Sequence, residues 1–527
     1  MLDTQALDAR PVETADETEE PPPAPHTDHP AAHLNKDPYN PQSRAPFFEA
    51  VRDYTQKDMV AFHTPGHKYG QGIDPEFLAL AGRNVFRMDL CELPEVDNLH
   101  DPEHVLKEAM ELAAQAYGAD HTFFLVNGST CGNNTMVMSV CDPGDKILIP
   151  RNVHKSVISG VLLSGAIPVY ITPTWDKELG IDHNLTPEDV EAALQAHPDV
   201  KALFLVNPTY YGVTCNLREI AAICHRHDKP LLVDEAHGPH LHFHEGYPVS
   251  AVDAGADMVV QSTHKIIAGM TQTSMFHVNE GRVDLTRTRK VLQLLQSTSP
   301  NYVLMASLDV ARRQMALQGH ELLEHALQLA EWARTELNKI PGLYCFGKER
   351  IGFPGLYNID LSKVTINVSG LGISGFDCLD LLNERYGIQS EMATLTNVLQ
   401  IVTFGNTQAD MVRLVEAMRD IAREIHTQGV PRKLKPLVQQ MDLPALPEAV
   451  LTPREAFYAQ TERVPFQKSA GRVCTEIISP YPPGIPILVP GERITQEIVD
   501  YIQLVYRHGG FINGPEDIRL HTIKVVA

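Results

Sequence analysis

The sequence lacks long hydrophobic runs, and its cysteines are not arranged in pairs. No apolar stretch approaches the roughly 18 to 20 residues that a membrane helix needs, and no basic region followed by an apolar one marks a secretory signal. The eight cysteines are scattered, with no Cys-x-x-Cys pair, which favours reduced thiols over a disulfide framework or a zinc site. We therefore expect a cytoplasmic protein with no metal site and no membrane contact.

Positive charge is also scarce. Lys and Arg number 44 against 66 Asp and Glu, which gives a net charge of -22. This excess argues against nucleic acid as a partner, because a polyanion would be repelled. An acidic surface suits an enzyme with cationic substrates, since it raises their local concentration; the alternative is that the charge serves solubility alone.

The length of 527 residues is enough for two or three domains, and the sequence contains no internal repeat. Residues 1–45 are rich in Pro, Glu, Asp, Thr and His, so we expect a disordered tail. Residues 46–340 are expected to form a large domain, with 46–118 as its N-terminal segment. Residues 341–527 are expected to form a smaller α+β domain that contributes to the substrate site.

Short apolar runs alternate with amphipathic stretches from about residue 120 onward. The expected strands are residues 122–126, 146–149, 167–171, 201–206 and 230–233. Helix signals lie between several of them, such as Thr186 as a cap before Pro187 in the first turn. This alternation is typical of an α/β fold with a mostly parallel sheet covered by helices. In such sheets the site lies outside the carboxyl ends of the strands.

An acid and a lysine follow two of the apolar runs. Asp234 closes the run that starts at Leu231, and Lys265 lies 31 residues further on, after the run 257–261. This pairing is the one needed to hold pyridoxal phosphate, because the lysine forms a Schiff base with the aldehyde and the carboxylate pairs with the pyridinium nitrogen. Taken singly, Asp234 would also serve as a helix cap and Lys265 as a surface lysine.

A phosphate site is predicted where Gly128-Ser-Thr-Cys-Gly132 joins a strand to a helix. Glycines permit close approach of the backbone, the hydroxyls of Ser129 and Thr130 donate, and a helix N-terminus favours an anion. Ser262 and His264 flank the lysine. Each either contacts the phosphate or has a structural role.

Other polar residues near strand ends carry weaker signals. His154 follows a strand and is placed to stack on the cofactor ring, although a lone histidine is more often a packing or surface residue. His237, three residues after Asp234, either lies near the substrate carboxylate or supports Asp234. The loop 296–302 contains hydroxyls that ordinarily cap the next helix.

These segments together resemble the ornithine/lysine/arginine decarboxylase family of fold-type-I pyridoxal phosphate enzymes, from about residue 46 to the C-terminus. The resemblance is to the shorter branch, because only a tail precedes residue 46, where the long members carry a flavodoxin-like domain. It therefore favours a dimer, or a small multiple of one, over a decamer. The motifs that carry it are Phe62-His-Thr-Pro-Gly-His-Lys68, Asp97-Asn-Leu-His-Asp101, Val126-Asn-Gly-Ser-Thr130, Arg151-Asn-Val-His-Lys-Ser156, Pro208-Thr-Tyr-Tyr-Gly212, Val233-Asp-Glu-Ala-His-Gly238, Gln261-Ser-Thr-His-Lys265, Ser297-Thr-Ser-Pro300 and Tyr481-Pro-Pro-Gly-Ile-Pro486.

The resemblance implies a large aminotransferase-like domain with a mostly parallel seven-stranded sheet, a smaller C-terminal α+β domain, and a homodimer with shared active sites. It implies that Lys265 carries the cofactor, that Asp234 holds its ring nitrogen and that His154 stacks on the ring. The residues implied to contact the phosphate or the rest of the cofactor are Ser129, Thr130, Thr209, His237, Ser262 and His264, together with Ser297 and Thr298 from a loop that reaches the neighbouring subunit.

The implied reaction is decarboxylation of a basic amino acid, with Lys265 or His237 returning a proton to Cα. Arginine, giving agmatine for polyamine synthesis, is expected first; lysine and ornithine are the alternatives. Glu476 resembles the family's acid for the cationic tail, and Glu391 is the second choice; either is otherwise a solvated acid. An aminotransferase or aldolase on the same fold, or a regulatory homologue without turnover, remains a rival.

Overall fold

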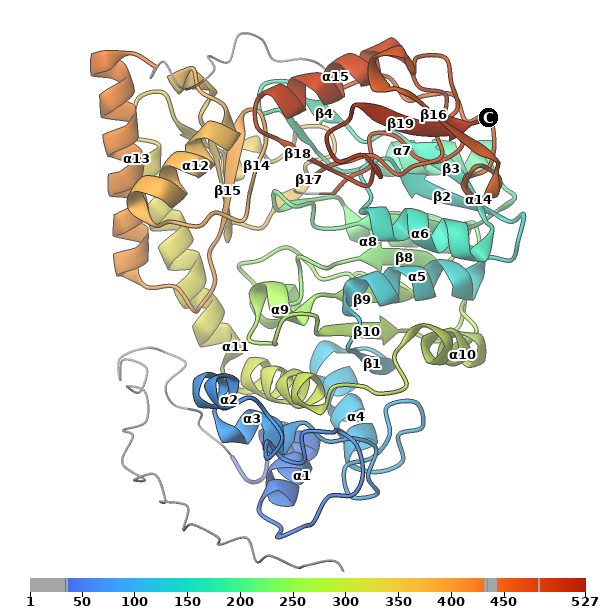
Figure 1. Ribbon diagram of the computed structural model, residues 1–527, viewed down its shortest axis with the longest axis vertical. Helices are drawn as coiled ribbons and strands as arrows, with labels where there is room; N and C mark the ends of the chain where they lie inside the picture. The colour runs from blue at the N-terminus through green and yellow to red at the C-terminus, as the bar shows by residue number, and fades with distance from the viewer. Residues whose placement is uncertain (1–33, 35–36, 431–433, 435–442, 482–483) are drawn as a thin grey trace, which may run out of the picture.

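The computed structural model describes residues 34, 37–430, 434, 443–481 and 484–527. Figure 1 shows a large sheet in the middle of the molecule, a smaller sheet beside it, N-terminal helices at one end and C-terminal elements over one edge of the large sheet. No helix in these ranges is both long and apolar enough to cross a membrane. The expected tail, residues 1–45, lies mostly outside the described residues.

The large sheet has seven strands in the order β1-β10-β9-β8-β6-β2-β3. The five strands from β9 to β3 are parallel to one another, whereas β10 is antiparallel to both of its neighbours. All five expected strands are present within one residue at each end; β10 lies outside those expectations. The bounds are β1 (His121–Leu125), β2 (Lys146–Pro150), β3 (Ile167–Ile171), β6 (Val200–Val206), β8 (Leu231–Asp234), β9 (Met258–Gln261) and β10 (Ser274–Val278).

Helices cover both faces of this sheet because successive strand side chains point to opposite sides. Ile147 and Ile149 of β2 pack with the core under α5, α6 and α10, whereas Leu148 packs with the core under α7 and α8. These helices are α5 (Gly128–Val140), α6 (Lys155–Ser164), α7 (Pro187–Ala196), α8 (Leu217–Arg226) and α10 (Leu285–Leu295). The parallel sheet is therefore buried on both sides, as its continuous apolar strands require.

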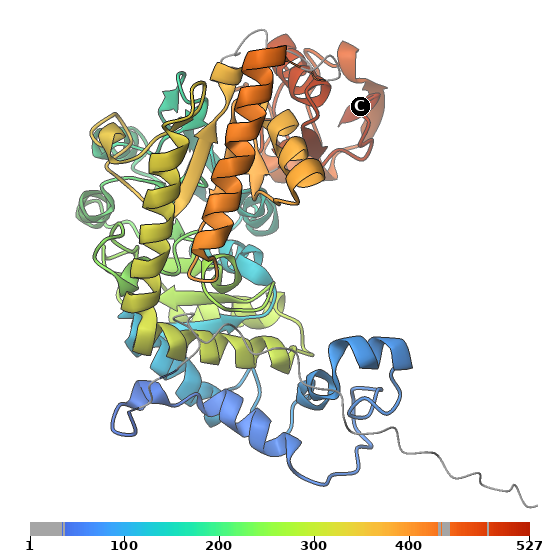
Figure 2. The same cartoon turned by 90° about the vertical axis from the view of Figure 1, so that its left-hand side faces the viewer.

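The N-terminal segment forms helices that pack against the start of the long helix α11 (Tyr302–Leu337). Figure 2 shows α2 and α3 projecting away from the central sheet. Residues 40–45 belong to this packed part, since backbone carbonyls at Gln42 and Arg44 accept hydrogen bonds from Arg312 of α11. The elements are the 3-10 helix η2 (Pro41–Ser43), α1 (Pro46–Thr55), α2 (Pro75–Ala81), α3 (Arg83–Met88) and α4 (Val105–Tyr117).

Helix α11 leads from the large sheet to a four-stranded antiparallel sheet in the order β11-β13-β15-β14. Its 36 residues carry the chain along the side of α13, as Figure 2 shows. This α+β unit has its own core. Its elements are β11 (Tyr344–Cys345), β13 (Lys363–Asn367), α12 (Gly375–Tyr386), β14 (Met392–Ala393), β15 (Asn397–Ile401) and α13 (Gln408–Gln428).

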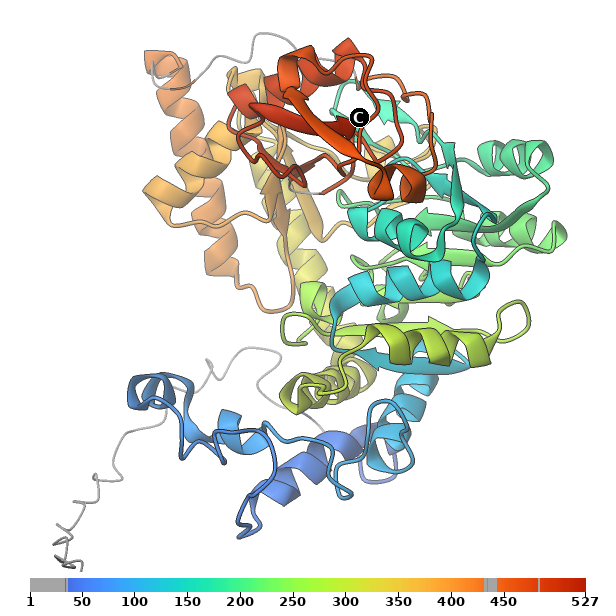
Figure 3. The ribbon, with the colours of Figure 1, turned by 45° about the vertical axis from the view of Figure 1, so that its right-hand side comes forward.

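The C-terminal elements form another core, centred on α15. Strand β16 pairs with β19, and β17 pairs with β18. Figure 3 shows these elements in front of the β2–β3 side of the large sheet, where α14 packs on α6. Their bounds are α14 (Pro453–Tyr458), β16 (Thr461–Pro465), β17 (Ser479–Tyr481), α15 (Gln496–Arg507), β18 (Phe511–Asn513) and β19 (Thr522–Val526).

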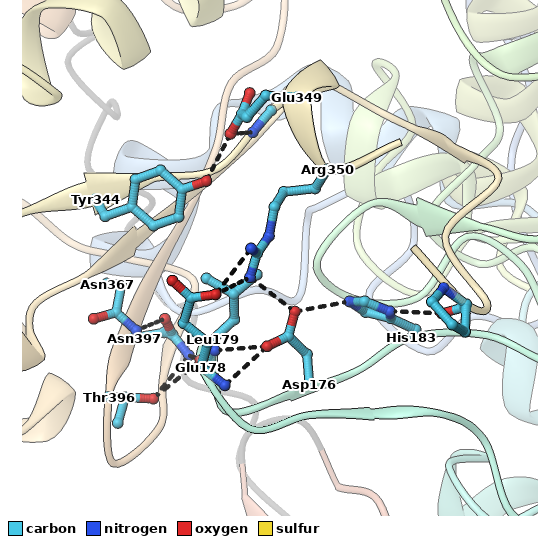
Figure 4. A network of polar contacts seen from close by, with 12 residues as sticks. Asp176, Glu178, Leu179, His183, Tyr344, Glu349, Arg350, Asn367, Thr396 and Asn397 are labelled. Carbon is cyan, nitrogen blue, oxygen red and sulfur yellow. Dashed lines mark hydrogen bonds and ion pairs between the residues drawn. The ribbon is translucent and has the colours of Figure 1, made fainter. Parts of the chain in front are cut away.

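A polar network joins the small sheet to a hairpin of the large domain (Figure 4). Arg350 donates to Asp176 (3.0 Å) and to Glu178 (2.9 Å) next to the hairpin β4 (Trp175–Asp176) and β5 (Ile181–Asp182). The Asn397 amide on β15 donates to the Leu179 carbonyl at 2.7 Å. Strands β7 (Val213–Thr214) and β12 (Asn358–Ile359) add a second junction. These contacts hold the small sheet beside the carboxyl ends of the large one.

Candidate active site

Two neighbouring parallel strands bring an acid and a lysine to the same edge of the sheet. Strand β8 ends at Asp234, and β9 is followed by the short helix α9 (Thr263–Ile266), which carries Lys265. Asp234 is buried, and it acts on the pKa of Lys265 by opposing the effect of burial. The structure therefore places these two residues at the same edge of the sheet.

Lys265 also lies against His237 and Tyr210. Its Nζ is 2.9 Å from His237 Nε2 and 5.7 Å from the centroid of the Tyr210 ring. Burial lowers the pKa of Lys265, and burial followed by the charge of Lys265 lowers the pKa of His237 well below its usual value. A lysine with a lowered pKa spends more time as the neutral amine, which is the form that attacks a carbonyl group.

A chain of hydrogen bonds connects Asp234 to His154 through two residues. The Asn133 side-chain amide, on α5, donates to Asp234 Oδ2 at 2.7 Å and to Ser156 Oγ at 2.8 Å. Ser156 Oγ in turn lies 2.8 Å from His154 Nδ1. Burial, followed by the charge of Lys265, lowers the pKa of His154 to about 4, so its ring is neutral at pH 7. The hydrogen bonds therefore link the position of the Asp234 carboxylate to that of the His154 ring.

Serine hydroxyls gather at the N-terminus of α5. Ser129 Oγ lies 2.7 Å from Ser262 Oγ and 3.0 Å from Ser274 Oγ on β10. Gly128 begins the helix with φ +69°, in the left-handed region that glycine adopts without strain. Hydroxyls at a helix N-terminus, where backbone N–H groups are unpaired, make a site for an anion such as phosphate.

Gly132 determines how closely α5 approaches the sheet. A Cβ atom at this position would lie 2.3 Å from Cγ2 of Val260 on β9. Because Gly132 has no side chain, α5 packs closely enough against the sheet for the Asn133 side chain to reach Asp234.

The other residues expected to contact the cofactor differ in their exposure and in their hydrogen bonds. Thr130 is exposed in the first turn of α5, and His264 Nδ1 lies 2.8 Å from the Thr273 carbonyl. Thr209 is buried, and its hydroxyl accepts the Val213 N–H at 3.2 Å. Ser297 and Thr298 are exposed, and the Ser297 N–H donates to the Asn127 side chain at 3.4 Å.

The two candidate acids for a cationic substrate lie in different settings. Glu391 is exposed beside β14, and its charge raises the pKa values of Lys265 and His264 against the larger lowering effect of burial. Glu476 is partly buried among the C-terminal elements, where its two carboxylate oxygens accept the N–H of Glu516 at 2.7 Å and that of Lys524 at 2.8 Å. Of these two candidates, Glu391 is the one whose charge acts on Lys265.

A buried charge cluster supports the turn that carries His237. Lys363 Nζ donates to Asp360 Oδ2 at 2.6 Å and to the His237 carbonyl at 3.3 Å. His240 Nε2 lies 3.1 Å from the same Asp360 oxygen, and these side chains are fully buried. Lys363 and His240 hold the pKa of Asp360 well below its usual range despite its burial. Lys363 also lowers the pKa of His237.

Several residues of this site were not identified from the sequence: Asn133, Ser156, Tyr210, Ser274 and Lys363. For Asn133 a signal was available, because it follows Ser129 by four residues and so lies on the same face of the helix. Ser274 and Lys363 reach the site from an antiparallel strand and from the small sheet. No local pattern marks such long-range contacts.

Comparison with known proteins assigns the chain to a family. Residues 45–410 match the model for the Orn/Lys/Arg decarboxylase major domain, and residues 435–512 match the model for the C-terminal domain of the same enzymes. The chain belongs to the Orn/Lys/Arg decarboxylase family. The expected resemblance is confirmed, and so is the expectation of an enzyme.

Two relatives in this family are the arginine decarboxylases of Halalkalibacterium halodurans, 47% identical, and Bacillus subtilis, 45% identical. Each alignment covers 92% of this chain and 98% of the relative. The lysine decarboxylase LdcF of Francisella novicida has a similar structure, with a TM-score of 0.81 and 25% identity over 92% of this chain and 81% of that one. The expected fold class, a mostly parallel seven-stranded sheet with a smaller α+β part, is confirmed.

Proposed function

We propose that this protein decarboxylates L-arginine to agmatine and CO2, with pyridoxal phosphate as its cofactor. The substrate assignment is supported by the relatives named arginine decarboxylase, which are 45% and 47% identical over nearly their full length. The lysine decarboxylase LdcF is only 25% identical. Lysine is therefore the second candidate substrate, and ornithine the third.

The single observation that carries the chemistry is the placement of Lys265 and Asp234 at adjacent strand ends. Burial raises the pKa of Asp234 more than Asn133 and Lys265 lower it, so a further positive group is needed to stabilise the carboxylate. The protonated ring nitrogen of pyridoxal phosphate is such a group. At the other end of the cofactor, the Ser129–Ser262 hydroxyl pair and the N-terminus of α5 fit the phosphate.

Each residue of the site has a separate role in the proposed reaction. When bound, pyridoxal phosphate supplies an electron-accepting ring that stabilises the negative charge left at Cα as CO2 departs. Asp234 keeps the ring nitrogen protonated, and His154 holds the ring in place from one side. Lys265 Nζ and His237 Nε2 lie 2.9 Å apart, so either atom is placed to return a proton to Cα.

The substrate's cationic tail requires a carboxylate partner. We propose that Glu391 supplies it from the same chain, because its field reaches Lys265. Glu476 is the alternative, and in a shared site it would act with its carboxylate already oriented by two backbone N–H groups. A guanidinium group favours a planar, bidentate carboxylate, which either glutamate offers.

We further propose a cytoplasmic homodimer with shared active sites. In the N-terminal segment, Val60, Phe62 and Leu80 are 80%, 94% and 86% exposed, which is unfavourable unless another surface covers them. The exposed side chains of Ser297 and Thr298 are consistent with a loop that reaches a neighbouring subunit. All eight cysteines are free thiols, in keeping with a reducing compartment.

The test is an assay of purified protein with pyridoxal phosphate and arginine, lysine or ornithine in parallel, measuring CO2 and amine. We expect kcat/KM to be highest for arginine, with equal amounts of agmatine and CO2. A higher value for lysine would transfer the assignment to lysine decarboxylation. Formation of a keto acid without CO2 would identify an aminotransferase instead. A protein that gains no visible absorption with the cofactor would indicate a regulatory homologue.

A further inference from the structure

A cavity of about 460 Å³ lies where the large domain, the small sheet and the C-terminal elements meet. Its size is within the range of roughly 300 to 1,000 Å³ that small-molecule sites occupy. Among the described residues, its lining does not include Lys265, Asp234 or His154. The cavity is thus a different space from the proposed reaction site.

Asp182, in the hairpin strand β5, is an acid that faces this cavity. Its carboxylate has no hydrogen-bond or ion-pair partner within residues 37–430, 443–481 or 484–527. Burial is the cause that raises its pKa to about 7, with no opposing effect from a cation. A carboxylate in such surroundings is stabilised as the anion only when a positive group pairs with it.

Two tyrosines bring hydroxyl groups to the same space from other parts of the chain. Tyr211 follows β6 in sequence, and Tyr501 lies on α15; both line the cavity. Burial is the main cause that raises their pKa values, and the charge of Asp182 adds to the effect on each. The three groups therefore lie near one another, and neither hydroxyl has a protein partner among the described residues.

The rest of the lining favours an organic cation over an anion. Trp175 and Phe376 add aromatic faces, which attract cations and pack against methylene groups. Two cations also line the cavity, and both are already engaged. Arg151 pairs with Glu492 at 2.8 Å and lies over the Tyr170 ring, and Lys177 has an interaction of its own. A metal ion would require more oxygen ligands than one carboxylate and two phenols supply.

We propose that this cavity is a second binding site, separate from the Lys265 site, for a small aliphatic amine in its ammonium form. The ammonium group lies at Asp182, Tyr211 and Tyr501, and the methylene chain lies along the apolar lining, which includes Phe376 and Leu395. The lining joins three parts of the chain. A bound amine therefore stabilises their arrangement and raises the melting temperature.

The test uses the full-length protein loaded with pyridoxal phosphate, with butane-1,4-diamine as the probe and butane-1,4-diol as its uncharged counterpart. Equilibrium dialysis counts bound probe molecules per chain without turnover, so the result is independent of which amino acid is decarboxylated. We expect the wild type to bind one more diamine per chain than the Asp182→Asn and Tyr501→Phe variants. The diol is not expected to bind there.

Glu497→Gln is the matched control, since this exposed acid lies on α15 one turn before Tyr501. It is expected to bind as the wild type does. The additional binding is expected to strengthen from pH 6 to pH 8, as Asp182 ionises. Equal diamine binding by the wild type and both cavity variants overturns the proposal, as does equal binding of the diol. If Asp182→Asn loses its fold by circular dichroism, Tyr501→Phe and Tyr211→Phe decide the question.

Discussion

Lys265 Nζ lies 2.9 Å from His237 Nε2, at the edge of the sheet where β8 and β9 end. Burial lowers the pKa of both groups, and each positive charge nearby lowers that of His237 further. The pair therefore shares a single proton more readily than it holds two. This is a suitable state for an amine that attacks a carbonyl group and for a neighbour that exchanges protons with it.

Replacing Lys265 by alanine is expected to abolish turnover and to remove covalent attachment of the cofactor. The reason is that Lys265 is the amine whose charge acts on Asp234, the proposed partner of the ring nitrogen. Borohydride reduction followed by mass spectrometry measures the attachment on the peptide that carries Lys265. Full activity in this variant would contradict the site assignment.

Asn133→Ala is expected to weaken cofactor binding about tenfold or more, because a hydrogen bond to a charged group contributes about 1.5 to 3 kcal/mol. The change removes both the contact with Asp234 and the link to Ser156. Absorbance titration of the cofactor-free protein with pyridoxal phosphate gives the Kd. Asn134→Ala removes the same side chain one residue further along the helix, about 100° around its axis, and is expected to change the Kd little.

The pKa of His154 predicts how stability depends on pH. This pKa is lowered to about 4 in the folded protein, whereas an unfolded histidine titrates near 6.5. The unfolded chain therefore binds more protons between about pH 4 and 6.5, so the free energy of unfolding rises with pH in that window by at most about 3 kcal/mol. Urea unfolding at several pH values measures it. His154→Phe is expected to flatten this part of the profile, and an unchanged slope would show that His154 is not its source.

Glu391 and Glu476 are the two candidates for binding the cationic end of the substrate, and their glutamine variants are expected to change different properties. Glu391→Gln is expected to raise KM for the basic substrate by tenfold or more, with an unchanged melting temperature, because Glu391 is exposed and its charge acts toward Lys265. Glu476→Gln is expected to lower the melting temperature, since the amide nitrogen of glutamine cannot accept one of the two backbone N–H groups. An unchanged KM in the first variant together with a raised KM in the second would assign the tail to Glu476.

The parts of the fold that follow from local pattern could be predicted from the sequence. The strands of the parallel sheet are continuous apolar runs; Asp234 is the last residue of β8, and Lys265 follows the end of β9 by four residues. The antiparallel strand β10 has no such signature, although it contributes Ser274 to the hydroxyl group at α5. The cluster of Lys363, Asp360 and His240 depends on the small sheet packing against the large domain, which no short stretch of sequence specifies.

Helix α5 approaches β9 closely at Gly132 because glycine has no Cβ atom. The position of Asn133, and with it the hydrogen bond that holds Asp234, depends on this close approach. With a methyl group placed 2.3 Å from Val260, either the helix or the strand would have to shift. A displacement of about one ångström would stretch the Asn133–Asp234 hydrogen bond beyond its useful length. Substitutions at this glycine would therefore impair the enzyme by spoiling alignment while every reacting side chain stayed intact.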